Sequence, residues 1–243
     1  MATPYDTLRA ELDRDGTRPF TTFYDDATGE RIELSVATFD NWVAKTAGLL
    51  RDGLSAQPGD RVALLLPPHW QTLVWACACW AVGTTVVVTP DAAATADVAV
   101  TGPDSIQDAA SAPDVVALSL RPLGARFSSP LPPGVLDYAV EVPGFPDRLV
   151  PYVAPPDDDP ALETPTDSSS YGALLAAGKD RAAALDAGPG SRVLVSASDL
   201  ADAVLDALLV PLFVGGSAVL VRNEDPVTRD ARMVSERATV VAR

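Results

Sequence analysis

The groups that could contact a phosphate lie together in residues 168–179: Ser168, Ser169, Ser170, Tyr171, Gly172 and Lys179. Backbone N–H groups of such a stretch can surround phosphate oxygens where a helix begins. A serine that caps the first turn of an ordinary helix explains the same letters. We favour a helix cap at Ser168 or Ser169, and the phosphate contact is the alternative.

The single histidine of the sequence, His69, stands in PPHWQ between an apolar run and a helical pattern. In open α/β sheets, ligands bind where the carboxyl end of a strand meets the next helix. A lone histidine at a helix start more commonly caps the helix or lies on the surface. His69 is therefore a candidate ligand contact, and we predict no catalytic residue.

Metal sites and nucleophilic triads find little support in the residue inventory. One histidine leaves no second imidazole for a shared metal, and Cys77 and Cys79 project about 200° apart on a helix, too far for a disulfide. Asp199, Asp202 and Asp206 have a spacing that could hold a hard cation. Acidic residues in a first helical turn are also what the helix dipole favours. We predict no metal site.

The composition excludes several classes of partner. The chain has 243 residues, 47% of them hydrophobic, and a formal net charge of −15. This charge repels nucleic-acid backbones and anionic lipid. The amino-terminal residues are charged, and the apolar stretches are shorter than the ~20 residues that span a bilayer. We expect a cytoplasmic protein that binds neither nucleic acid nor membrane.

The elements that must position these groups begin with a helix. Its apolar positions, Phe39, Val43, Ala47 and Leu50, recur at intervals of three or four residues. Gly53 is the expected left-handed cap at its end.

A strand–helix–strand unit follows. Pro58 and Gly59 form a turn, RVALLL is a buried strand, and residues 70–82 form an apolar helix that ends at Gly83 before a valine-rich strand. Further strands are expected at ADVAVTG and DVVALSL, with a short helix between them.

The second half of the chain repeats this pattern. A helix follows SSSYG, then Pro189 and Gly190 form a turn, and RVLV is a strand before a helix at 200–213. Gly215 ends that helix, SAVLVR is a strand, and a helix at 225–237 precedes the strand ATVVAR. The proline-to-glycine spacing is 25 residues in the first unit and 26 in the second.

The repeat predicts an α/β fold of two related βαβ halves with mainly parallel sheets. We place the halves at residues 1–121 and 168–243, within what we expect to be one compact unit. The proline- and aspartate-rich residues 122–167 connect them. Their prolines exclude long helices, so we expect an irregular connection with one strand at LDYAVEV. A disordered linker is the alternative.

The residues from LSVATFDNW to VVVTP resemble the opening of the large domain of the AMP-binding, or adenylate-forming, superfamily. The shared pattern is a helix, Pro-Gly-Asp-Arg-Val, an apolar strand, a helix that ends at Ala81 and Gly83, and the strand Val86 to Val88. The residues from PGSRVLV onward resemble the second subdomain of that family. The resemblance implies a large domain with two like-folded halves.

The resemblance also implies catalytic parts that this sequence does not match. The family holds ATP phosphates with a Ser/Thr/Gly-rich loop that ends in Pro-Lys-Gly, whereas TDSSSYGALLAAGKD has one glycine before its helix and no Pro-Lys. An aromatic or histidine motif follows the next strand in the family, and Ser196 to Asp199 stand there instead. The sequence ends before the family's adenine-binding strand, ribose-binding aspartate, hinge and small carboxyl-terminal domain.

We therefore expect a truncated homologue of the large domain that has no cofactor, lacks adenylation activity and acts as a binding or interaction module. The alternative is a protein that retains a nucleotide, acyl or CoA-type ligand, or that completes a ligase site with a partner chain. ATP and Mg²⁺ belong only to this alternative. ATVVAR would present an open sheet edge, where we expect a second copy of the chain or another protein.

Overall fold

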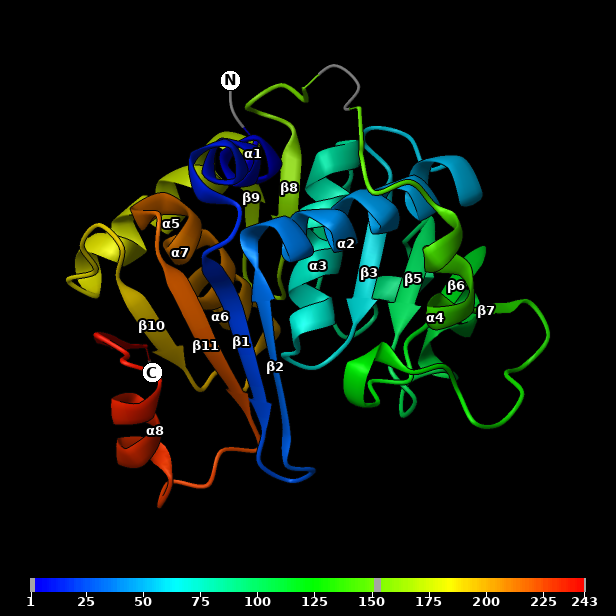
Figure 1. Cartoon of the computed structure of the whole chain (residues 1–243). Helices are drawn as coiled ribbons and strands as arrows, with labels where there is room; N and C mark the ends of the chain where they lie inside the picture. Colours follow the sequence, from blue (N-terminus) through cyan, green and yellow to red (C-terminus); the bar gives the residue numbers. More distant parts are fainter. Residues whose placement is uncertain (1–2, 151–153, 243) are drawn as a thin grey trace.

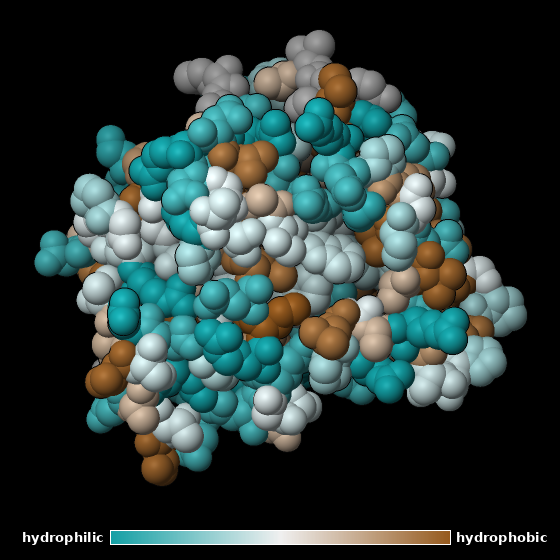
Figure 2. All heavy atoms as spheres, in the orientation of Figure 1, coloured by the Kyte–Doolittle hydropathy of each residue, from teal (hydrophilic) through white to brown (hydrophobic). Residues whose placement is uncertain are grey.

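The structure, a computed structural model, describes residues 3–150 and 154–242. It contains two β-sheets with helices packed between and around them (Figure 1). Figure 2 shows one face of the molecule, on which hydrophilic residues prevail and apolar residues form separate spots. Within the described residues, no helix is both long and apolar enough to cross a membrane.

The first sheet has seven strands in the order β7-β6-β5-β3-β4-β8-β9. All neighbours pair in parallel except β8 and β9. The strands are β3 (Arg61–Leu65), β4 (Thr85–Val87), β5 (Val98–Thr101), β6 (Asp114–Ala117), β7 (Val135–Asp137), β8 (Pro160–Glu163) and β9 (Ser168–Ser170).

The second sheet has five strands in the order β12-β10-β11-β1-β2, and only β2 runs antiparallel to its neighbour. The strands are β1 (Pro19–Asp25), β2 (Glu30–Ser35), β10 (Arg192–Val195), β11 (Ser217–Arg222) and β12 (Val240–Ala242). In the described residues, β12 pairs with β10 alone. The predicted association of a second copy or partner at this edge stays a prediction.

The helix α3 occupies the centre of the molecule. Every one of its 13 residues is buried, and it contacts β4 of the first sheet and β1 of the second. After Gln71 and Thr72 in its first turn, its side chains are apolar on all sides, because the helix is buried between the two sheets. The helices are α1 (Pro4–Asp15), α2 (Val36–Gly48), α3 (Trp70–Val82), α4 (Tyr138–Glu141), α5 (Tyr171–Ala184), α6 (Leu200–Val204), α7 (Val210–Val214) and α8 (Arg229–Ser235).

The two predicted Pro-Gly turns make equivalent backbone hydrogen bonds. Gly59 N donates to the carbonyl of Gly83 at 2.9 Å, and Gly190 N donates to the carbonyl of Val214 at 2.8 Å. Both turn glycines have positive φ, 91° and 76°. Each turn is thus tied to the end of the helix that follows its strand, which explains why the chain repeats the same turn. The mainly parallel α/β architecture is confirmed.

The sheets do not follow the predicted halves. β1 and β2, from residues 1–121, join the second sheet, whereas β8 and β9 extend the first. One hydrophobic cluster runs through both halves.

The end of α2 differs from the prediction. Gly53 is not left-handed; the helix continues through a π-helical turn at Leu49–Gly53, and Ser55 has the positive φ of 60° instead.

The connection also differs from the prediction. The LDYAVEV strand ends at Asp137, whose side chain caps α4 by accepting from Ala139 N at 3.0 Å. The sequence analysis missed β8, which Trp80 holds by donating Nε1–H to the carbonyl of Ala161 at 2.9 Å. The described residues 122–150 and 154–167 thus include parts of the first sheet, which a disordered linker would not provide.

Candidate functional site

A cleft of about 780 Å³ lies where strands of both sheets end. Its walls come from the residues that follow β3, β4, β5 and β6 in the first sheet and β1, β10 and β11 in the second. Carboxyl ends of parallel strands form the ligand-binding edge of open α/β sheets. The cleft is therefore the candidate functional site.

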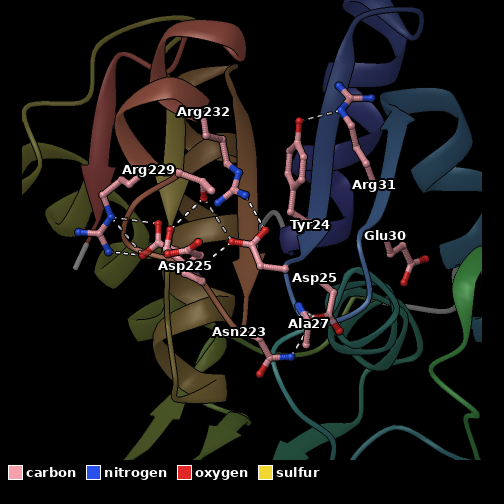
Figure 3. A network of polar contacts seen from close by, with 12 residues as sticks. Tyr24, Asp25, Ala27, Glu30, Arg31, Asn223, Asp225, Arg229 and Arg232 are labelled. Atoms are coloured by element: carbon pink, nitrogen blue, oxygen red, sulfur yellow. Dashed lines mark hydrogen bonds and ion pairs between the residues drawn. The ribbon is translucent and has the colours of Figure 1, made fainter.

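Arg222, Asp25 and Glu30 form a row across β11, β1 and β2 at this edge, because they are cross-strand partners. Asp25 is buried and accepts hydrogen bonds from Asn223 Nδ2 at 2.8 Å and Ala27 N at 3.0 Å (Figure 3). Arg222 lies 3.9 Å from the other carboxylate oxygen of Asp25. Burial, followed by the charge of Asp25, raises the pKa of Glu30. The second-sheet wall is thus a fixed polar surface.

The helix α8 holds this wall in place from the other side. Arg232 pairs with Asp26 at 2.5 Å, and Arg229 donates from Nε to Glu224 at 3.0 Å (Figure 3). The Tyr24 ring lies between two guanidinium groups, with Arg232 at 4.6 Å and Arg31 at 5.6 Å from its centre. The end of β1 is therefore braced by charged contacts to α8.

The charge of the cleft is negative. Four carboxylates line it against a single basic residue among the described lining residues, Arg222; they are Asp25, Asp104, Asp108 and Asp199. Asp25 already offsets part of the Arg222 charge. A polyphosphate would meet net repulsion here, because little cationic charge is left to balance it.

His69 is the amino-terminal cap of α3 and follows Pro67 and Pro68, which line this cleft. Its Nδ1 accepts from Gln71 N at 3.2 Å, and its ring packs edge-on against Phe23 with 4.5 Å between ring centres. The side chain is 1% exposed, and Nε2 has no hydrogen-bond partner among the described residues. Burial, with a smaller effect of Arg222, lowers the pKa of His69 to about 3. The preceding Pro67 and Pro68 line the cleft, and His69 does not.

The SSSYG stretch lies in the strand β9 and the first residues of α5. Ser168, Ser169 and Ser170 make up β9, paired with β8. Ser170, rather than the predicted Ser168 or Ser169, caps α5 by accepting from Ala173 N at 3.3 Å. The cap falls one residue later because β9 occupies the earlier serines.

The remaining predicted residues are engaged elsewhere. Tyr171 is buried and donates its hydroxyl to the carbonyl of Thr84 at 3.0 Å. Gly172 N donates to the carbonyl of Asp157 at 2.9 Å. Lys179 is exposed on α5. None of these residues lines the cleft. Tyr171 contacts Thr84 beyond the carboxyl end of α3, whereas His69 caps the amino end of that helix, so the structure does not bring the two together.

Asp199, Asp202 and Asp206, whose spacing could hold a cation, do not form a common site in the structure. Asp199 caps α6 through Ala201 N at 2.8 Å, and Asp206 forms a bidentate pair with Arg181 at 2.7 and 2.8 Å. A π-helical turn separates α6 from α7, so this helix is not regular. Of these three aspartates, only Asp199 lines the cleft.

The sequence analysis missed the second-sheet wall, since it assigned no strand to residues 19–35. The alternating apolar and polar residues of FTTFYDDATGERIELS are typical of a hairpin around a turn. That pattern would have placed Asp25 at a strand end.

Comparison with known proteins assigns the chain to a family. The AMP-binding enzyme family model matches residues 9–102. A TIGR03089 family protein of Mycobacterium tuberculosis (strain ATCC 25618 / H37Rv) is 40% identical over 250 residues, which span 99% of this chain and all of that protein. The chain belongs to the TIGR03089 family. The match of residues 9–102 agrees with the AMP-binding resemblance of the sequence.

Solved structures show the fold of this TIGR03089 family member. An acyl-CoA synthetase from Brucella canis has a TM-score of 0.81 and 18% identity, with 99% of this chain and 47% of that chain covered. A fatty acyl CoA synthetase from Mycobacterium tuberculosis has a TM-score of 0.75 and 15% identity, with 97% and 48% covered. The family member thus spans about half the length of these synthetases.

Proposed function

We propose that this protein is a binding or interaction module of the AMP-binding superfamily that does not itself form acyl-adenylates. The observation that carries the proposal is the cleft at the strand ends, which keeps the ligand-binding position of the fold but has an acidic lining. Adenylation requires backbone donors around the phosphates and cations at the developing charge. Residues 168–179, the alternative phosphate contact of the sequence analysis, lie in the paired strand β9 and the helix α5.

We expect no ATP–pyrophosphate exchange above buffer background when the protein is given Mg²⁺ and pooled carboxylic acids. Lys179→Ala should leave this result unchanged, because Lys179 is exposed on α5 and does not line the cleft. Exchange that follows the pure protein and disappears in a Ser168/Ser169/Lys179 triple-alanine variant would contradict the proposal. It would identify residues 168–179 as a divergent phosphate loop.

The second candidate function is retention of an AMP-, acyl- or CoA-type ligand, used alone or in a site completed by a partner chain. The position of the cleft and the membership in the AMP-binding superfamily favour it. An anionic ligand of this kind would depend on Arg222, the basic residue of the described lining.

Thermal unfolding with AMP, CoA, ATP or an acyl-adenylate analogue separates the two functions. A ligand at a hundred times its Kd adds about 2.7 kcal/mol to the free energy of unfolding. We expect no such stabilisation by ATP. If AMP or CoA stabilises the protein and Arg222→Ala removes the effect while Lys179→Ala does not, the second function holds.

A further inference from the structure

A second hollow, of about 610 Å³, lies at the β7 edge of the first sheet. The loop from Arg121 to Leu131 forms one side of it, and β7 and α4 form the other. Its lining shares no residue with that of the cleft. The side chains that matter below are Arg121, Arg126, Phe127, Leu131, Asp137 and Val140.

Two arginines of this hollow lack a carboxylate partner among the described residues, Arg121 and Arg126. Most other described arginines are ion-paired, as expected in a chain with a net charge of −15. Arg121 donates from its guanidinium to the backbone carbonyl of Arg126 at 3.1 Å, which holds the loop closed. Both arginines line the hollow, and this bond holds the guanidinium of Arg121 in place there.

The one carboxylate in the hollow does not neutralise these arginines. Asp137 accepts from Phe127 N through one oxygen and from Ala139 N through the other, both at 3.0 Å. Its charge is thus directed to backbone donors. An anionic group that enters the hollow would find two guanidinium groups able to donate to it.

Apolar side chains accompany the arginines. Phe127 and Leu131 line the hollow, and Val140 lines it while 55% exposed. Leu123, in the same loop, is 79% exposed. Figure 2 shows apolar spots on the side of the molecule where α4 lies. Exposed apolar residues beside charged ones are typical of a surface that binds another protein.

We propose that this hollow binds an acidic, extended segment of a partner protein. Arg121 and Arg126 would receive its carboxylates, and Phe127, Leu131 and Val140 would receive the apolar residues between them. β7 is an edge strand with no strand beyond it among the described residues, a position at which extended segments commonly bind. Charge complementarity favours an acidic partner, because Arg121 and Arg126 have no carboxylate partner among the described residues although the net charge of the chain is −15.

The test uses the full chain and a fluorescent peptide in which glutamate alternates with valine, followed by fluorescence anisotropy. We expect binding that weakens as salt increases. The Arg121→Gln/Arg126→Gln variant should weaken it by about tenfold or more, since hydrogen bonds to charged groups are the strong ones. Arg148→Gln/Arg237→Gln is the matched control: it removes the same charge from exposed arginines outside the hollow.

Five results would overturn the proposal. Absence of peptide binding, or equal loss in the two double variants, would remove the role of the hollow. Equal binding of a peptide with glutamine in place of glutamate would remove the carboxylate recognition. Complete competition by millimolar inorganic phosphate would identify a small-anion site. A dimer in light scattering that Arg121→Gln/Arg126→Gln dissociates would assign the hollow to a second copy of the chain.

Discussion

Gly216→Ala is expected to destabilise the protein by about 3 kcal/mol or more, because overpacking against rigid backbone cannot relax cheaply. A Cβ at this position would lie 2.0 Å from the carbonyl oxygen of Ser191 and 3.1 Å from its carbonyl carbon. That oxygen accepts from Ser217 N at 3.0 Å, a bond that ties the turn before β10 to the start of β11. The methyl group would therefore separate two central strands of the second sheet.

Gly188→Ala is the matched control for this change. A Cβ at Gly188 would meet nothing within 4 Å, and its φ is not positive. We expect its free energy of unfolding to stay within about 0.5 kcal/mol of the wild type. Urea unfolding followed by circular dichroism measures both variants. Equal midpoints for Gly216→Ala and Gly188→Ala would mean that the turn and β11 do not approach this closely.

Those parts of the fold that depend on neighbouring residues could be predicted from the sequence. The helix at 70–82 has the predicted bounds because an apolar run, a capping histidine and a left-handed glycine lie within one stretch. The turns at Gly59 and Gly190 follow from the conformational freedom of glycine after proline.

The pairing of distant strands could not be predicted in the same way. β1 pairs with β11 about two hundred residues away, so no local pattern names its partner. The hairpin of β1 and β2 has a local signal, which the analysis did not use. The missed β8 lies in a proline-rich segment and pairs through only two residues with β4, so its composition gave no indication of a strand.

The cleft shows the same limit more sharply. Asp25 and Arg222 are ordinary strand-end residues in the sequence, and they become a site wall only because β1 and β11 are adjacent. Conversely, the residue types of Ser168 to Gly172 would suit a phosphate contact. In the structure the serines pair with β8, and Ser170 caps α5. The sequence shows which residue types are present, but which of them come together depends on the order of strands in the sheet.

The contribution of His69 to the stability of the protein is expected to fall by about 2 kcal/mol when the pH is lowered from 7.5 to 5. The sequence has one histidine, and its folded pKa is about 3 against an ordinary value of 6.5. Below pH 6.5 the unfolded chain therefore binds a proton that the folded chain does not bind. The stabilisation is complete above pH 6.5 and decreases toward pH 3.

Carboxyl groups with raised pKa values act in the opposite direction. Burial raises the pKa values of Asp40 and Glu30, so these groups bind protons in the folded protein first and stabilise it as the pH falls. The total change with pH is consequently a sum of opposing effects. A variant that removes only the imidazole is needed to isolate the effect of His69.

His69→Asn is that variant, because asparagine keeps a hydrogen-bond acceptor at the cap for Gln71 N and does not titrate. It should be less stable than the wild type at pH 7.5, having lost the ring that packs against Phe23. The difference in unfolding free energy between the two proteins should shrink by about 2 kcal/mol from pH 7.5 to 5, since the carboxyl contributions are common to both. A constant difference over this range would mean that the imidazole is protonated in the folded protein as readily as in the unfolded chain. Water or a carboxylate would then have to reach the imidazole. The observed burial of His69 against Phe23 leaves no room for either.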